Sequence, residues 1–343
     1  MRRTLEMDLE FLPYLDQPPV QPAQLQKKAT SNDAVTIDAW RDIWINNAKE
    51  NHERYGPFVN THLGLEWGRF RNQPAIVVGS GPSLKNSIEA LKQNKSIPVI
   101  SCLHNFHYLV DNDIKVDLWV TLDSGKVTIE EISEGGQHPP EYYIEKTKGQ
   151  KLAAYIASDP ELIETWKGEV LWFSCGIPDK KIREAMDDIE KFEVYISNGG
   201  NVLGASMYIA KAFWGCNPIA FTGADFCFDY IKKFHPWDSK YDGKLGKALI
   251  TNDIFGNKVY TWQSYNNFKG WFEGVTMRVP GEWINISEGG TLGAYPNGLI
   301  PSIKQMAAVD FVRGYHICEE IRYMAENPTN ATEPGLDAPK ILF

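Results

Sequence analysis

The sequence lacks most features of a secreted, disulfide-stabilised or membrane-spanning protein. Its five cysteines are odd in number, lie far apart and include no C-x-x-C pair, so neither a disulfide framework nor a zinc site is predicted. The N-terminal segment has no signal-peptide core, and no apolar run reaches membrane-spanning length. We therefore expect a cytoplasmic protein without a membrane span, whose cysteines act as small buried hydrophobic residues.

A block of positive charge is also missing. The 35 Lys and Arg residues are outnumbered by 44 Asp and Glu residues, and the net charge of −9 is spread along the chain. Nucleic acid held through phosphate contacts is therefore not an expected partner. Hydrophobic residues make up 43% of the 343 residues, which is enough for a substantial core. A nucleotide can still bind such a chain through backbone N–H groups.

The most informative segment is a glycine-containing turn that follows an apolar run at 75–78. It comprises Gly79, Ser80, Gly81, Pro82 and Ser83, and a helical pattern follows. Glycine lets an anion approach the backbone closely, and the first N–H groups of a helix are open to it. The turn predicts a phosphate site, with a plain strand-to-helix turn as the alternative. On this interpretation a valine at Gly81 blocks the phosphate, at little cost to the fold if the φ angle of the turn tolerates it.

Other nucleotide and hydrolase signatures do not fit this turn. The third glycine of the dinucleotide fingerprint is replaced by Leu84, and no Walker lysine or serine-hydrolase elbow is present. From residue 74 onward, strand-like and helical runs alternate, which predicts an α/β fold: a Rossmann-like, mostly parallel sheet with helices on both faces. The strand-like runs are 75–78, 97–102, 117–122, 151–156, 170–174, 193–196 and 218–222, and the clearest helical runs are 84–94, 180–191 and 202–214.

Polar residues at the ends of these runs are candidates for ligand contact, because ligands of parallel sheets bind at the carboxyl ends of the strands. A second turn contributes Asn198, Gly199, Gly200 and Asn201, and is expected to form a wall opposite the first. Asparagines there suit a base, ribose or sugar hydroxyl, although turn formation and helix capping explain them equally well. Single candidates of the same kind are Asn105, Asp123 and Asp225.

The two aspartates also raise the question of a metal. Asp123 and Asp225 both end apolar runs, and paired carboxylates there could hold Mg²⁺. Aspartate is also a common turn former, so a metal site is not the favoured interpretation.

The pattern divides the chain into three parts. Residues 1–70 are an N-terminal arm and a packing helix over 36–55; the part of the arm at 13–34 is either extended over the surface or a flexible linker. Residues 71–300 are the nucleotide-binding domain, and residues 301–343 are a helix from about 302 to 326 and a loose tail. Within the domain, 226–283 is rich in aromatic residues and is expected to be an irregular, mobile lid. His235 lies in this lid and is the candidate general base, with a purely structural histidine as the alternative.

Several motifs in the same order resemble the MptE-like family, which includes the motility accessory factors and archaeal 6-hydroxymethylpterin diphosphokinases. They are VVGSGPSL, VTLDSG, SNGGNVLGASMYIAKAFWGCNPIAFTGADF, GNKVYTWQSYNNFKGWFEG and INISEGG, spread over roughly residues 70–300. The first and third are also similar to bacterial sialyltransferases that use CMP-activated sugars. The resemblance implies a Rossmann-like domain with a nucleotide at Gly79 to Ser83.

The resemblance implies two chemistries. One is transfer of a nonulosonic, sialic-like acid from a CMP donor to a glycan or protein acceptor, with no further cofactor. The other is transfer of diphosphate from ATP with Mg²⁺, which would use Asp123 or Asp225. The YTWQSYNNFKGWFE and INISEGG segments are closer to the motility branch and favour glycosyl transfer. The family's Lys-Thr-His-Ala motif is replaced here by Lys233-Phe-His-Pro236, so an inert nucleotide-binding or assembly protein is a third hypothesis.

Overall fold

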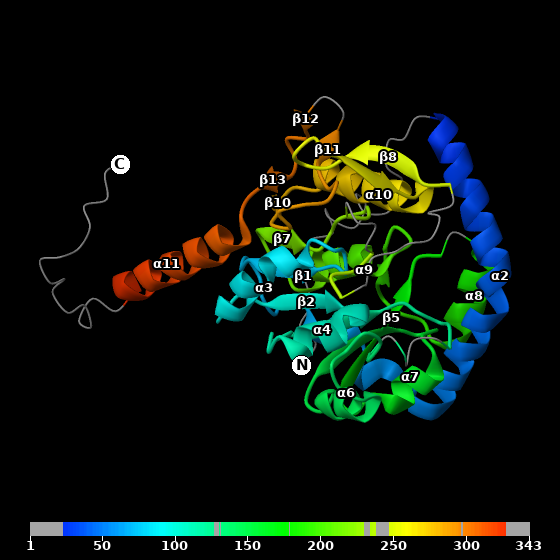
Figure 1. The fold of residues 1–343 in the computed structure, drawn as a ribbon. Coiled ribbons are helices and arrows are strands. Elements are labelled where there is room, and N and C mark those ends of the chain that lie inside the picture. Colours follow the sequence, from blue (N-terminus) through cyan, green and yellow to red (C-terminus); the bar gives the residue numbers. More distant parts are fainter. Residues whose placement is uncertain are drawn as a thin grey trace, which may run out of the picture.

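A computed structural model describes residues 23–126, 130, 132–177, 179–229, 234–237, 247–295 and 298–326. Within these ranges, nine strands form one sheet in the order β13-β10-β7-β1-β2-β3-β4-β5-β6 (Figure 1), and every neighbouring pair is parallel. Helices surround the sheet. The expected Rossmann-like α/β class is confirmed.

The strands are short, apolar and buried, as expected for a parallel sheet covered on both faces. The first seven are β1 (Ala75–Val78), β2 (Val99–Cys102), β3 (Leu118–Thr121), β4 (Lys151–Tyr155), β5 (Glu169–Cys175), β6 (Tyr195–Ile196) and β7 (Ile219–Thr222). They match the seven predicted runs within about two residues, the usual uncertainty of element boundaries. Two strands that were not predicted, β10 (Trp283–Asn285) and β13 (Lys304–Gln305), extend the sheet beyond β7.

The helices also follow the predicted pattern in the main domain. They are α3 (Leu84–Gln93), α4 (Phe106–Asp111), α6 (Pro140–Lys146), α7 (Pro160–Thr165), α8 (Lys180–Ile189) and α9 (Val202–Tyr208), which continues as a π-helix over Ile209–Phe213. Helix α9 packs against β1, β2 and β3, while α11 (Ala308–Glu326) packs against α3 and then projects from the body (Figure 1). The tail after 326 lies outside the described residues.

The N-terminal region differs from the expected extended arm. Helix α2 runs from Ala23 to Tyr55 along one side of the molecule (Figure 1), so residues 23–34 are helical. After Pro22 the sequence AQLQKKA consists of good helix formers, and the proline content that suggested an arm lies before residue 23. Residues 13–22 are outside the described ranges. Asn51 of α2 is fully buried, so this helix is part of the packed body.

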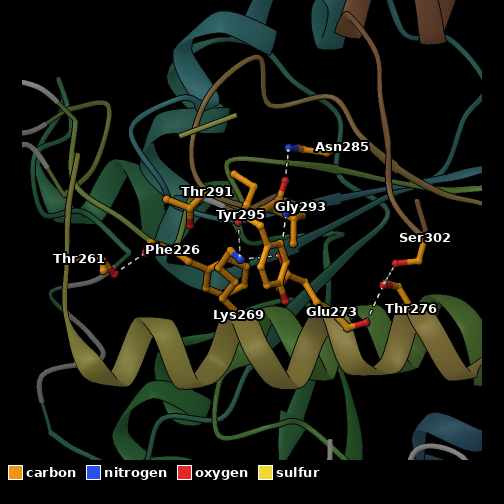
Figure 2. Close-up of polar contacts among 12 residues, drawn as sticks. Phe226, Thr261, Lys269, Glu273, Thr276, Asn285, Thr291, Gly293, Tyr295 and Ser302 are labelled. Atoms are coloured by element: carbon orange, nitrogen blue, oxygen red, sulfur yellow. Dashed lines mark hydrogen bonds and ion pairs between the residues drawn. The ribbon is translucent and has the colours of Figure 1, made fainter. Parts of the chain in front are cut away.

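The region expected to be an irregular lid contains regular, packed structure. It holds the hairpin β8 (Leu249–Asn252) and β9 (Lys258–Thr261), and the 16-residue helix α10 (Gln263–Arg278). Figure 2 shows why the helical periodicity of α10 is hidden: Lys269 and Glu273 point into the protein and pair with each other at 2.8 Å. Lys269 Nζ also donates to Ala294 O, and Glu273 accepts from Gly293 N and the Tyr295 hydroxyl. The expected irregularity is therefore wrong for residues 247–283.

The cysteines follow the sequence expectation with one exception. Cys102, Cys175, Cys216 and Cys227 are buried free thiols, whereas Cys318 of α11 is exposed. None of the described helices is both long enough and apolar enough to cross a membrane.

Candidate functional site

The order of the strands reverses between β1 and β7, and the turns that follow these two strands pack directly on each other. A Cβ atom on Gly79 would lie 2.5 Å from Gly223 O, and one on Gly81 would lie 2.7 Å from the same oxygen and 2.6 Å from Asp225 Cγ. Both glycines are therefore required by backbone packing within the protein. The expectation that valine at Gly81 leaves the fold intact is wrong.

The hydrogen-bond donors of the first turn are largely used inside the chain. Gly79 N donates to Thr222 O and Gly81 N to Gly223 O, both at 2.8 Å. Ser83 N donates to Asp225 Oδ2 at 2.7 Å, and the Ser83 hydroxyl donates to Asp225 Oδ1. Asp225 thus occupies the anion position at the start of α3, which a phosphate was predicted to fill.

Asp225 is well placed for this structural role. It is 2% exposed, and burial raises the pKa of its carboxyl to about 6, although the two Ser83 hydrogen bonds oppose the shift. Its carbonyl accepts from the backbone and the hydroxyl of Thr291, both at 2.8 Å. With both carboxylate oxygens bound to Ser83, Asp225 is engaged in holding two loops together.

The segment from Ile286 to Gly290 forms a third wall of this region; the sequence marked it only as part of the INISEGG motif and assigned it no contact with the glycine turn. Ser87 Oγ donates to Ile286 O at 3.0 Å, and Asn86 Nδ2 donates to Glu288 O at 3.1 Å. A Cβ on Gly289 would lie 3.0 Å from Ser83 Cβ, so the segment closes over the start of α3. The adjacent glycines after an apolar run, Gly289 and Gly290, were the available signal in the sequence.

The residues that follow the second glycine turn reach the first one, whereas the expectation that the two turns are opposite walls of one crevice stays a prediction. The Leu203 side chain follows that turn and would touch a Cβ on Gly79 at 3.3 Å. Its asparagines form turn and cap interactions: Asn198 Oδ1 accepts from Gly200 N, and Asn201 Oδ1 accepts from Gly204 N, both at 2.8 Å. A Cβ on Gly199 would lie 2.3 Å from Trp271, so α10 packs tightly on this turn.

The turns after β2, β3 and β4 have a different character, because several buried oxygens there have no hydrogen-bond partner among the described residues. Asn105 is fully buried; its Nδ2 donates to Ser101 Oγ at 3.0 Å, and its Oδ1 has no partner. The other unpartnered atoms in these turns are Ser124 Oγ, Ser158 Oγ and Asp159 Oδ2. Buried polar atoms normally have a partner, so this edge can accept hydrogen bonds from a ligand or from ordered water.

Helix α2 holds these turns in place through two asparagines one helical turn apart. Asn47 Nδ2 donates to Ser124 O at 3.0 Å and to Ala157 O at 3.2 Å. Asn51 Nδ2 donates to Ile156 O at 2.9 Å and to Ser158 O at 2.8 Å. The N-terminal helix therefore contributes to the site's framework.

The two candidate metal-binding aspartates are not brought together. Asp123 follows β3 and Asp225 follows β7, three positions apart in the sheet. Adjacent strands lie about 4.8 Å apart, which puts these strand ends about 14 Å from each other. Asp123 is exposed, and desolvation by the surrounding protein raises the pKa of its carboxyl. It can contact a ligand, but it cannot share one Mg²⁺ ion with Asp225 in this structure.

His235 lies directly on the first glycine turn. Its Nδ1 is 2.7 Å from Ser80 O, and its Nε2 is 3.2 Å from Nε2 of His104, which follows β2 in the 3-10 helix Leu103–Asn105. Trp237 stacks on the His235 ring with centroids 4.8 Å apart and contacts His104 at 5.3 Å. Sequence reasoning placed His235 correctly near the turn, but missed His104, which had no metal- or triad-type spacing.

Comparison with known proteins agrees with this architecture. The family model "6-hydroxymethylpterin diphosphokinase MptE-like" matches residues 43–230, which is more than half of the chain. A solved structure of the MAf glycosyltransferase from Magnetospirillum magneticum AMB-1 superposes with a TM-score of 0.52 at 16% identity, over 76% of this chain and 41% of that chain. This chain thus spans well under half of that protein.

No curated protein matches the chain. The structural likeness at this identity shows the fold, and the family model supplies the relationship. Together with the predicted motifs, most of which fall inside the matched range, it confirms the resemblance found in the sequence. The chain therefore belongs to the 6-hydroxymethylpterin diphosphokinase MptE-like family.

Proposed function

We propose that the protein is a nucleotide-dependent transferase, and specifically a glycosyltransferase that moves a nonulosonic acid from a CMP donor to a glycan or protein acceptor. The observation that carries the proposal is the position of His235 on Ser80 O of the glycine turn. A base at that point lies where the phosphate of a bound donor and the hydroxyl of an acceptor would meet. The MAf glycosyltransferase supports the same reaction class through its fold.

The nucleotide is proposed to lie across the carboxyl ends of β1 to β4. Ser80 offers a backbone N–H toward the phosphate, while the unpartnered oxygens of Asn105 and Ser124 offer acceptors for an amino group or a ribose hydroxyl. Asp123 is exposed beside them and can accept from the ribose. On this arrangement Asn198 and Asn201 shape the second turn and contact the ligand through its backbone, because their side-chain oxygens are engaged.

Diphosphate transfer from ATP is the second candidate, since the matching family model is described by that activity. That reaction needs a cation to offset the charge on the phosphoryl oxygens. The separation of Asp123 from Asp225, and the use of Asp225 by Ser83, leave Asp123 as the candidate carboxylate. The residues present therefore fit metal-independent glycosyl transfer better.

The test is a thermal-shift screen of CMP, CDP, UDP, ADP and ATP, each with Mg²⁺ and with EDTA. A ligand that binds the folded state at 100 times its Kd adds about 2.7 kcal/mol of stability. We expect CMP to raise the melting temperature, with the shift unchanged by EDTA. Preference for ATP together with strict Mg²⁺ dependence would favour diphosphate transfer instead. No shift with any nucleotide would support an assembly protein without nucleotide chemistry.

A further inference from the structure

Two hydrogen bonds of the His235 ring indicate which ring nitrogens carry protons. Ser80 O can only accept, so Nδ1 of His235 must be the protonated, donating nitrogen. In a neutral imidazole the other nitrogen is then an acceptor. Nε2 of His235 therefore accepts from His104, whose Nε2 must carry a hydrogen. The chain of donors runs from His104 through His235 to the carbonyl of the glycine turn.

This arrangement leaves the available basic lone pair on His104, whereas the sequence predicted His235 as the base. The Nε2 lone pair of His235 is directed at His104, so it is not available to an acceptor hydroxyl. Nδ1 of His104 is the remaining acceptor of the pair and has no hydrogen bond among the described residues. His104 also lies at the carboxyl end of β2, next to Asn105, and thus on the side of the proposed nucleotide position.

The surrounding side chains fix both rings. Trp237 stacks on His235, and Tyr108 of α4 lies 5.4 Å from Trp237. His107 packs edge-on to Trp237 at 4.6 Å. Among the described residues, those whose charge lowers the pKa of His104 are His235 and His107.

We propose that His104 and His235 act together as one base, in which the acceptor's proton enters at Nδ1 of His104 and the positive charge comes to rest on His235. The inference rests on the proposed transferase function. As the acceptor oxygen forms its bond to the sugar carbon, its proton passes to His104 Nδ1. His104 gives its Nε2 proton to His235 Nε2, and the electron pair of the broken sugar–phosphate bond stays on the departing phosphate. His235 is the positioning and charge-bearing partner, and Ser80 O accepts from it throughout.

The protonation of His104 agrees with this exchange. Burial, followed by the positive charges of His235 and His107, lowers the pKa of His104 to about 3. Such a group does not keep a proton of its own at neutral pH, so a proton that enters at Nδ1 has to be matched by one that leaves from Nε2.

The first test is the tautomer of each ring, measured by long-range ¹H–¹⁵N NMR on protein labelled at histidine nitrogens. We expect hydrogen on Nε2 of His104 and on Nδ1 of His235, with signals assigned by His104→Gln and His235→Asn. His62 is an internal control, because its Nδ1 accepts from Gly64 N at 3.0 Å and its hydrogen must be on Nε2. Hydrogen on Nδ1 of neutral His104 would overturn the proposal. This readout does not require turnover, so it separates the pair's chemistry from the proposed reaction.

The second test uses one amide variant of each histidine, His104→Gln and His235→Asn. Glutamine places its Nε2 where the histidine Nε2 lies, so His104→Gln retains the contact to His235 but lacks a basic nitrogen. We expect turnover of the CMP donor to fall about a hundredfold or more, with donor affinity nearly unchanged. His235→Asn should cost about as much, and the double variant no more than either single one.

Full turnover in His104→Gln, or losses that multiply in the double variant, would contradict a shared base. The folded state of each variant is checked by its melting temperature. A wild-type protein that binds CMP but transfers nothing would contradict the proposed function, while the tautomers would still decide the proton arrangement.

Discussion

The two halves of the sheet's carboxyl edge differ in how their polar groups are satisfied. At β1 and β7, the turn amides, Ser83 and Asp225 bind one another, and the Ile286–Gly290 segment closes over them. At β2, β3 and β4, buried oxygens of Asn105, Ser158 and other side chains have no partner among the described residues. The glycine turn that stands out in the sequence is mainly a structural joint, and the unused hydrogen-bonding capacity lies beside it.

The largest expected loss of stability comes from adding one carbon atom to the turn after β1, in the half of the edge whose polar groups bind one another. Gly81→Ala places a Cβ 2.6 Å from Asp225 Cγ, which should destabilise the protein by about 3 kcal/mol, measured by urea unfolding. Gly176→Ala is the matched control after β5, since its Cβ meets Ile196 O at 3.9 Å and should cost well below this. Equal losses in the two variants would remove the distinction between the halves.

The two aspartates give the next largest contrast. Asp225→Asn cannot accept both Ser83 hydrogen bonds, so it should lose about 2 kcal/mol of unfolding free energy. Asp123→Asn changes an exposed side chain and should stay within about 0.5 kcal/mol of the wild type. The rise in melting temperature caused by CMP should be reduced more by Asp123→Asn than by Asp225→Asn. A destabilised Asp123→Asn variant would mean that this edge is structural too.

Two fully buried serines, one in each half, allow a closer comparison because the same atom, the hydroxyl oxygen, is removed from both. Ser87 Oγ accepts from Thr222 at 2.7 Å and donates to Ile286 O, so Ser87→Ala should lose about 1 kcal/mol. Ser158 Oγ has no partner, so Ser158→Ala should be neutral or slightly stabilising by the same unfolding measurement. A clear loss at Ser158 would show that its hydroxyl is already satisfied, for example by ordered water.

The smallest expected effect is the change of unfolding free energy with pH that is due to His104, which lies between the two halves. His104 has a pKa of about 3 when folded and an ordinary value of 6.5 when unfolded, so between these values the unfolded chain binds more protons. Stability therefore falls as pH drops below 6.5, by less than about 1 kcal/mol between pH 7 and 6. His104→Gln should remove this part of the pH dependence, measured by denaturant unfolding at each pH. An identical pH profile in the variant would contradict the shifted pKa.

The sheet was predictable from the sequence because its first seven strands are continuous apolar runs, and the turns after them fix its carboxyl edge. Strand β13 was not predicted because both of its residues, Lys304 and Gln305, are polar. Strand β10 was not predicted because it is three residues long and begins at the end of the segment that was expected to be irregular. Helix α10 was not predicted because its buried positions include Lys269 and Glu273. Charged residues are usually exposed, and the sequence does not show that these two pair with each other inside the protein. The bond from Ser83 to Asp225 spans 142 residues of sequence, and no local pattern signals it.

The strands that extend the sheet past β7 determine where the chain can be shortened. The family match ends at residue 230, yet β7 hydrogen-bonds on its outer side to the segment at 282–286, which lies more than 50 residues later. A fragment ending at 230 would expose the apolar Ile219–Thr222 strand as an unpaired edge, which is a template for aggregation. A soluble expression fragment should therefore extend at least through Gln305, where the sheet ends.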